Sequence, residues 1–214
     1  MLQNIPLFSM LEQKELDALS SHAVTKTYPK NSVIINEGDR TDSMYVIMSG
    51  RVKIVLTDED QKEVIIDIQH PGDYFGELAL LDEAPRSASV KTMENSTFLI
   101  ISKHQLQKCL REHPEIGIGL IRGLAQRLRA TTGNVKSLAL LDVYGRIART
   151  LLQLANEEDG RQVISDKLTH QDLANMVGAS REMVSRIMKD LADGGYIKTE
   201  GKKITIKEKL PPGW

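Results

Sequence analysis

The spacing of apolar residues predicts a β-rich segment over about residues 24 to 101. Apolar and polar residues alternate there, which is typical of strands that are buried on one face. Glycines and short polar runs, such as residues 58–61, separate the strands. The clearest alternating positions are Val52, Ile54, Leu56, Val64, Ile66 and Ile68. We expect many short antiparallel strands that form a jelly-roll-like β-barrel.

After this segment the period becomes helical, and it stays so from about residue 103 to 138. A short helix is expected to end near His113-Pro114, and a long helix to follow it. A seam of residues recurs every three or four positions on the long helix: Leu120, Leu124, Leu128, Thr131, Val135 and Leu138. The seam favours pairing of two copies of the chain, with packing on the chain's own barrel as the alternative.

Three glycines lie in the first turns of the long helix, at Gly117, Gly119 and Gly123. Each is expected to cost about 1 kcal/mol relative to alanine. Our hypothesis is that this end of the helix frays or repacks when a ligand binds. At the start of the chain, Ser9-Met-Leu-Glu12 predicts a capping box for a short helix.

The C-terminal part of the chain predicts two helices joined by a glycine turn, over residues 169–177 and 180–191 with Gly178 between them. This is a helix-turn-helix pattern. Gly194-Gly195 is expected to end the second helix, and residues 196–207 read as a hairpin wing that turns at Gly201.

One face of the second helix is predicted to be polar and available to a DNA groove. It carries Arg181, Glu182, Ser185, Arg186 and Lys189, opposite Val184, Ile187, Met188 and Leu191. Arginine can pair with guanine O6 and N7, glutamate can accept from cytosine N4, and lysine can contact phosphate. Ser180 is expected to cap this helix.

Charge is unevenly distributed along the 214 residues, although the net charge is only −1. The first 110 residues carry 11 Lys and Arg against 16 Asp and Glu, and residues 169–214 carry 8 against 6. An acidic first part and a mildly basic last part indicate two different roles.

Other features of the sequence limit the class of protein. The single cysteine, Cys109, cannot form an intramolecular disulfide or hold a zinc or iron-sulfur site alone. No metal site is expected. The sequence has no run of about 18 apolar residues and no secretory signal, so we expect a cytoplasmic protein without membrane contact. The five histidines are scattered, and no catalytic cluster can be read.

The segment from Phe75 to Val90 carries the most specific chemistry in the chain. Gly76 precedes a short helical turn and allows close approach of an anion to the backbone. Arg86 offers a planar fork of donors for phosphate oxygens, Glu77 can accept from a sugar hydroxyl, and Ser87 adds a hydroxyl. The alternative is an ion pair between Glu77 and Arg86 that ties a surface turn to the barrel.

This segment resembles the phosphate-binding cassette of cyclic-nucleotide-binding domains. The whole chain resembles bacterial transcription regulators of the cyclic-AMP receptor protein type, within the larger family that includes fumarate and nitrate regulators. The resemblance implies that cyclic AMP is the effector and that no catalytic cofactor is needed. It implies these ligand-binding residues: Gly76, Glu77, Leu78, Arg86, Ser87, Thr131 from the same subunit and Thr132 from the partner subunit.

The resemblance also implies which residues meet DNA and where the chain bends. The DNA-binding residues would be Thr169, Gln171, Ser180, Arg181, Glu182, Ser185, Arg186 and Lys189. Asp142 would cap the helix after a hinge. RNA polymerase is an implied partner.

These observations give an α+β fold with three parts: a cyclic-nucleotide-binding barrel over residues 1–110, a dimerisation helix over 111–138 and a winged helix-turn-helix domain over 139–214. We expect a homodimer that binds a palindromic DNA site when ligand is bound, and not an enzyme. Two alternatives remain: a regulator of the same fold with another effector or none, and a nucleotide-binding subunit that acts on a protein partner.

Overall fold

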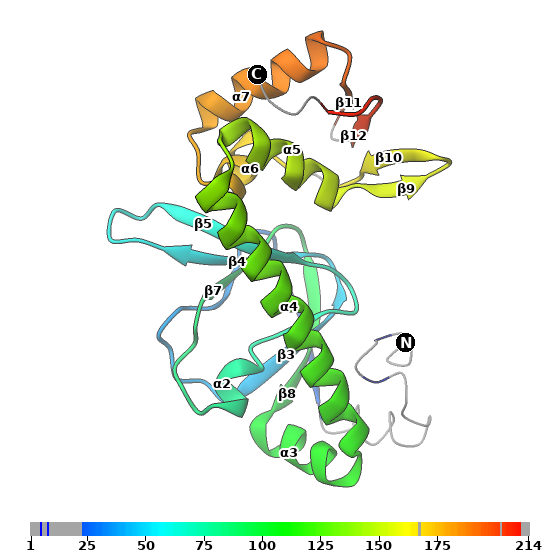
Figure 1. The fold of residues 1–214 in the computed structure, drawn as a ribbon. Coiled ribbons are helices and arrows are strands. Elements are labelled where there is room, and N and C mark those ends of the chain that lie inside the picture. The colour runs from blue at the N-terminus through cyan, green and yellow to red at the C-terminus, as the bar shows by residue number, and fades with distance from the viewer. Residues whose placement is uncertain (1–4, 6–7, 9–22, 167, 202, 211–214) are drawn as a thin grey trace. The chain divides into compact units, whose positions relative to one another are not determined.

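The computed structural model describes residues 5, 8, 23–166, 168–201 and 203–210 and divides into two compact units, Met1–Arg129 and Ala130–Trp214 (Figure 1). The predicted capping box at Ser9 to Glu12 lies outside the described residues. Each unit has its own buried cluster of apolar side chains. In the described part of the chain, no helix combines the length and the hydropathy that a bilayer crossing requires.

The first unit contains two antiparallel sheets of four strands each (Figure 1). In spatial order, one sheet consists of β1 (Val24–Tyr28), β8 (Ser96–Ser102), β3 (Ser43–Ser49) and β6 (Tyr74–Phe75). The other consists of β2 (Val33–Ile35), β7 (Ser89–Thr92), β4 (Val52–Thr57) and β5 (Glu63–Gln69). The prediction of a jelly-roll-like β-barrel is confirmed.

Aromatic side chains fill part of the space between the sheets. Phe75 and Phe98 are buried, and their ring centroids lie 5.4 Å apart with the planes at 88°. Tyr45 stacks on Phe75 at 5.0 Å. Offset and edge-to-face aromatic pairs of this kind add to the free energy gained by burial. They fix the position of Phe75, the last residue of β6 and the first of the cassette.

The alternation predicted for β4 and β5 is wrong in its second half. Ile54 pairs with Asp67 and Val55 pairs with Ile65, which leaves Ile66 of β5 as an extra residue at this register shift. An extra residue in a strand exchanges the faces of the side chains beside it, and on β5 the buried apolar residues are Ile65 and Ile68 instead of the predicted Val64, Ile66 and Ile68. On β4 the buried residue is Val55, while Leu56 is 38% exposed.

The described part of the first unit also contains the helices α2 (Leu78–Leu81), α3 (Lys103–Glu112) and α4 (Pro114–Leu140), and α4 continues into the second unit. Ser102 and Gln105 form a capping box at the start of α3. Pro114 is the first residue of α4. Proline has no backbone N–H, but the N–H at the first position of a helix has no partner inside the helix, so no hydrogen bond is lost. The break at His113-Pro114 and the long helix after it are therefore confirmed.

The predicted seam on α4 requires one correction. Leu120 is only 3% exposed and packs with Ile116 in the apolar cluster of the first unit. Ile121 is 63% exposed instead. Exposure continues along α4 at Leu128 and Val135, so the exposed apolar row passes through Ile121 and not through Leu120.

The second unit is a winged helix-turn-helix fold, as predicted. It contains α5 (Val143–Leu154), β9 (Asn156–Glu158), β10 (Arg161–Ile164), α6 (His170–Val177), α7 (Arg181–Asp193), β11 (Ile197–Glu200) and β12 (Lys203–Ile206). The strands form one sheet in the order β11-β12-β10-β9. The wing turns at Gly201, and Gly194 follows the last residue of α7.

Side chains at the helix starts of the second unit explain why the helices begin where they do. Asp142 accepts a 2.7 Å hydrogen bond from the Gly145 amide and caps α5. Thr169 and Ser180 cap α6 and α7 in the same way. Each cap satisfies a backbone donor that has no partner inside the helix.

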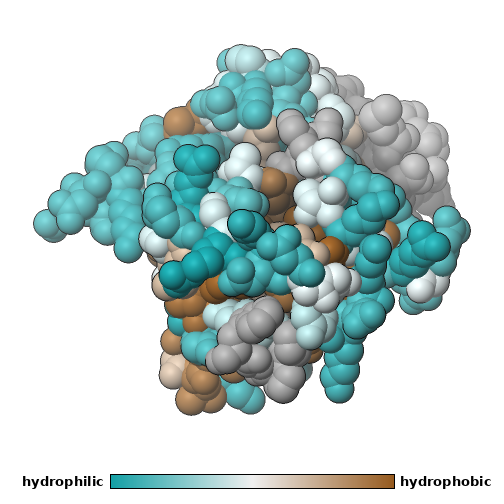
Figure 2. Space-filling model, turned by 90° about the horizontal axis from the view of Figure 1, so that it is seen from above, coloured by the Kyte–Doolittle hydropathy of each residue, from teal (hydrophilic) through white to brown (hydrophobic). Residues whose placement is uncertain are grey.

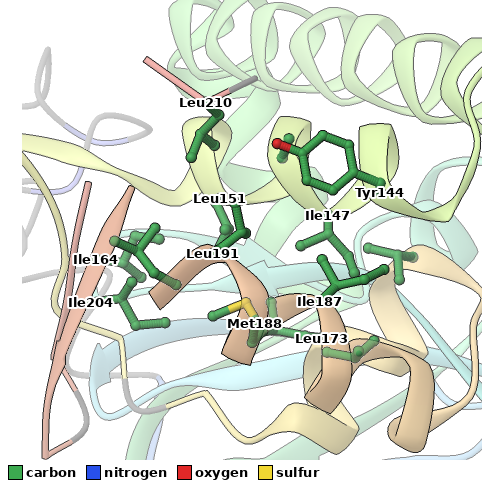
Figure 3. Close-up of a cluster of buried hydrophobic side chains, with 14 of the residues drawn as sticks. Tyr144, Ile147, Leu151, Ile164, Leu173, Ile187, Met188, Leu191, Ile204 and Leu210 are labelled. Carbon is green, nitrogen blue, oxygen red and sulfur yellow. The ribbon is translucent and has the colours of Figure 1, made fainter. Parts of the chain in front are cut away.

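The core of the second unit joins all three of its helices to the sheet (Figure 3). Tyr144, Ile147 and Leu151 come from α5, and Leu173 comes from α6. Ile187, Met188 and Leu191 line the inner face of α7, as the sequence predicts. This packing turns the opposite face of α7 outward.

Two adjacent leucines of α5 test this core. Leu151 is completely buried, whereas Leu152 is 46% exposed. We expect Leu151→Ala to lower the free energy of unfolding by about 2–5 kcal/mol, because it leaves a cavity. Leu152→Ala should lower it by less than about 1 kcal/mol. Urea denaturation followed by circular dichroism measures both changes, and equal effects would contradict the assigned core.

Candidate functional site

Arg86 lies at the centre of the cassette, and the residue is almost fully buried, at 3% exposure. Nε donates to the Thr41 hydroxyl at 2.7 Å, and the two terminal nitrogens donate to the carbonyls of Gly76 and Ser43. Burial lowers the pKa of Arg86, and the nearby Tyr45, Glu77, Asp42 and Asp39 act in the opposite direction. Arg86 forms no ion pair with any described residue.

Gly76 allows Arg86 to occupy this position. Its φ is +80°, in the left-handed region that side chains other than glycine rarely adopt. A Cβ at Gly76 would lie 2.7 Å from Arg86 Nη1. The predicted role of Gly76 was to bring the backbone close to an anion, and the structure adds that its missing side chain makes room for the arginine.

Glu77 pairs with Arg127 of α4 and not with Arg86. Arg127 Nη1 donates to Glu77 Oε1 at 2.7 Å, and Glu77 is 2% exposed. The alternative interpretation of the cassette, a Glu77–Arg86 ion pair, is therefore wrong. The second terminal nitrogen of Arg127 donates to the Tyr74 carbonyl, and its guanidinium lies 4.6 Å from the centre of the Tyr74 ring.

Two side chains of β5 lie close to the same arginine. Gln69 is 3% exposed; with its amide turned to match its neighbours, it accepts from Arg127 Nη2 and donates to the Tyr74 carbonyl, each at 3.1 Å. Burial raises the pKa of the Asp67 carboxyl, an effect that the charge of Arg127 opposes. Arg127, Gln69 and Asp67 were missed by sequence reasoning. The position of Arg127 one helical turn before Thr131 was the available signal.

The remaining predicted ligand residues are placed differently. Leu78 is 42% exposed, and Ser87 is exposed beside the buried Arg86. Thr131 and Thr132 are exposed on α4 and belong to the second unit. The structure thus brings Gly76, Glu77 and Arg86 together and places Arg127 beside Glu77. The roles of the two threonines stay predictions.

The polar face of α7 is largely open to solvent. Four of its predicted DNA-binding residues are exposed: Arg181, Glu182, Arg186 and Lys189. Hydrophilic residues also make up most of the molecular face that Figure 2 shows. Ser185 is half-buried, and its hydroxyl pairs with His170 Nδ1 of α6 at 2.8 Å. The structure therefore places His170, which sequence reasoning did not select, beside this face.

The three predicted contacts from helix starts make local hydrogen bonds. The Thr169 hydroxyl is part of the capping box with Asp172, and the Ser180 hydroxyl accepts from the Met183 amide at 3.2 Å. Gln171 donates to Asn175 at 2.8 Å. Any contact of these residues with DNA stays a prediction.

Other parts of the described structure show no competing site for the same chemistry. Within the described residues, no group of three His, Cys, Asp or Glu side chains could hold a metal ion. An open groove of about 930 Å³ lies along the wing and includes Arg161, Lys198 and Lys207. None of the predicted ligand-binding residues lines it.

Comparisons with known proteins match both units. Residues 25–113 match the cyclic nucleotide-binding domain family, and residues 145–209 match the Crp-like helix-turn-helix domain family. The CRP-like cAMP-activated global transcriptional regulator of Mycobacterium tuberculosis is 35% identical over 206 residues, which cover 94% of this chain and 92% of that protein. The cAMP-activated global transcriptional regulator Vfr of Pseudomonas aeruginosa is 38% identical, with 90% and 94% covered.

Solved structures agree with these matches. The c-di-GMP responsive global regulator CLP of Xanthomonas campestris has a TM-score of 0.78 and 27% identity, with 92% of this chain and all of that chain covered. The catabolite activator protein of Thermus thermophilus is 29% identical, has a TM-score of 0.57 and covers 95% of this chain and 94% of its own. The chain therefore belongs to the cyclic-AMP receptor protein (CRP) family of bacterial transcription regulators, whose members regulate transcription and are not enzymes.

Proposed function

We propose that this protein is a homodimeric transcription regulator whose affinity for DNA is switched by cyclic AMP. The observation that carries the proposal is the buried Arg86, which makes no direct ion pair with a described residue, although Glu77, Asp42 and Asp39 lie near enough to oppose the lowering of its pKa. A buried cation that is not directly paired with an anion is costly. A cyclic phosphate bound at the cassette supplies that partner.

The hydrogen bonds of Arg86 leave donors available for such a ligand. A guanidinium has five N–H groups. Three of them are used by Thr41, Gly76 and Ser43, which leaves one on each terminal nitrogen. Those two donors, together with the exposed hydroxyl of Ser87, suit two phosphate oxygens.

Glu77 and α4 hold the rest of the nucleotide in this proposal. Arg127 occupies Oε1 of Glu77, and Oε2 accepts from a ribose hydroxyl. Thr131 follows Arg127 by one turn of α4, and its hydroxyl accepts from the adenine amino group. Thr132 of the partner subunit does the same from the other side, and Leu78 contacts the nucleotide at the edge of the cassette.

Cyclic AMP is proposed as the effector because the curated relatives named above are cAMP-activated regulators. A second candidate is cyclic di-GMP, because the CLP protein, with a TM-score of 0.78, is described as responsive to it. A single phosphate between Arg86 and Ser87 favours the smaller nucleotide.

The exposed apolar row of α4 supports a homodimer. Ile121, Leu128 and Val135 are 63%, 68% and 60% exposed. Their spacing of seven residues is the period at which two helices pair along a common seam. Large apolar side chains left in water along a whole helix are costly, and a second copy of α4 would bury them.

The face of α7 supports recognition of double-stranded DNA. Arg181 and Arg186 can read guanine, Glu182 can accept from cytosine, and Lys189 can contact phosphate. In a two-fold dimer the two α7 helices read a palindromic site, with half-sites roughly 34 Å apart. Thr169, Gln171, Ser180 and Ser185 contact the backbone or support these side chains.

Ligand acts by shifting a population, because it can favour the DNA-competent arrangement only by binding it more tightly than the alternative. The link between α4 and α5, which ends at the helix cap Asp142, forms the hinge through which the two DNA-binding units change their arrangement. The protein acts in the cytoplasm, and RNA polymerase is its further partner at the promoter.

Replacement of Arg86 tests the ligand site. We expect Arg86→Leu to abolish the increase in DNA affinity caused by cyclic AMP, because the phosphate loses its charged partner. Arg111→Leu removes an exposed arginine of α3 and should leave the increase intact. Fluorescence anisotropy with labelled DNA, with and without cyclic AMP, cyclic GMP or cyclic di-GMP, measures the effect. Persistent induction in a folded Arg86→Leu protein would refute the assignment.

Replacement of two cations on α7 tests the DNA-binding face. Arg181→Ala should cost about 1–3 kcal/mol of binding free energy and relax preference at one base pair. Lys189→Ala should weaken binding to all sequences alike. It should also reduce the slope of log affinity against log salt concentration by about 1, as expected for the loss of one phosphate contact. Selection from random duplexes and salt titration distinguish the two outcomes. A uniform loss for Arg181→Ala would make it a phosphate contact.

A charge in the exposed row of α4 tests the dimer. Leu128→Glu should raise the dimer dissociation constant by about a hundredfold or more, because it buries a carboxylate without a partner. Ala130→Glu places the same charge on the other side of the helix and should leave the dimer intact. Sedimentation velocity over a range of concentrations measures both. Dissociation by both variants alike would argue against the seam.

A further inference from the structure

Gly123 of α4 lies directly against the side chain of Tyr74. A Cβ at Gly123 would overlap the Tyr74 hydroxyl oxygen and lie 3.3 Å from the ring carbon that bears it. Only glycine therefore allows the tyrosine to reach the helix backbone. Gly117 differs, because a Cβ there would make only an ordinary contact of 3.6 Å with Leu110.

The Tyr74 hydroxyl is buried at this contact without a hydrogen-bond partner. Tyr74 is 7% exposed, and its oxygen is the buried side-chain polar atom that no described residue satisfies. Burial raises the pKa of this phenol, so it stays neutral. A buried hydroxyl without a partner costs about 1–3 kcal/mol. The ring is therefore held there by its other contacts.

Those other contacts lead directly to the cassette. The guanidinium of Arg127 lies over the Tyr74 ring, and the Tyr74 carbonyl accepts a hydrogen bond from the same guanidinium. Arg127 follows Gly123 by one helical turn and donates to Glu77. The position of α4 at Gly123 thus decides whether Arg127 reaches Glu77.

We infer that Tyr74 and Gly123 are positioning residues that set where α4 lies on the barrel, and that through Arg127 they couple the cassette to the helix. The inference rests on the proposed function for its ligand. It also explains why residue 123 is a glycine without the predicted fraying of the helix. The helix α4 is continuous from Pro114 to Leu140, and the Tyr74 side chain leaves no room for a Cβ at Gly123.

The decisive test combines one substitution that introduces a clash with a second that removes it. Gly123→Ala introduces the clash with the Tyr74 hydroxyl, and Tyr74→Phe removes that oxygen. The ratio of DNA affinities with and without cyclic AMP should fall about fivefold or more in Gly123→Ala. In Tyr74→Phe/Gly123→Ala it should return to within about twofold of the unmodified protein. Gly117→Ala is the matched control and should leave the ratio unchanged.

A second readout does not depend on the ligand. Hydrogen exchange of the α4 amides in the ligand-free protein should be faster in Gly123→Ala than in the unmodified protein and should recover in the double variant. Alanine favours helix over glycine by about 1 kcal/mol. Faster exchange therefore cannot come from helix propensity, and Gly117→Ala should exchange no faster.

The outcomes separate this inference from the proposed function. A protein whose DNA affinity ignores cyclic nucleotides, but whose exchange pattern follows the variants, would refute the proposed effector and keep the positioning contact. If Gly123→Ala leaves both the affinity ratio and the exchange unchanged, the inference is overturned. It is also overturned if the double variant behaves no better than Gly123→Ala.

Discussion

The placement of one buried arginine determines the geometry of the cassette. Arg86 binds the carbonyls of Ser43 and Gly76 and the hydroxyl of Thr41, and so joins the start of β3 to the residues after β6. Its own backbone bonds to Asp39 and Gly38 at 2.9 Å. The side-chain partners of Arg86 are thus two carbonyls and one hydroxyl, and none of them carries a negative charge. An anion at the cassette is the simplest way to complete the site.

A second arginine gives this site its connection to α4. Glu77 is the acidic partner of Arg127, and its charge also acts on Arg86 of the cassette. Binding of a phosphate would give Arg86 a directly paired anion. Because Arg127 also lies on the Tyr74 ring, any change at Glu77 reaches the barrel face of α4 through direct contacts. That continuity is a physical requirement for coupling between two sites.

Features set by neighbours in the sequence were predicted well. The caps at Asp142 and Ser180, the break at His113-Pro114 and the glycine turn at Gly201 each depend on a few adjacent residues. The register shift at Ile66 of β5 was not predicted, because it depends on pairing with β4. Leu120 was assigned to the wrong side of α4 for the same reason: the barrel that buries it is distant in sequence.

By itself the sequence determined the order of the elements, the two kinds of unit and most of the residues with binding chemistry, because periodicity, caps and motifs are local properties. Only the tertiary structure decided the partners of those residues. It paired Glu77 with Arg127 instead of Arg86, placed Tyr74 against Gly123, and joined Ser185 to His170. Such pairs form between segments separated along the chain, and their distances follow from how the strands and helices pack.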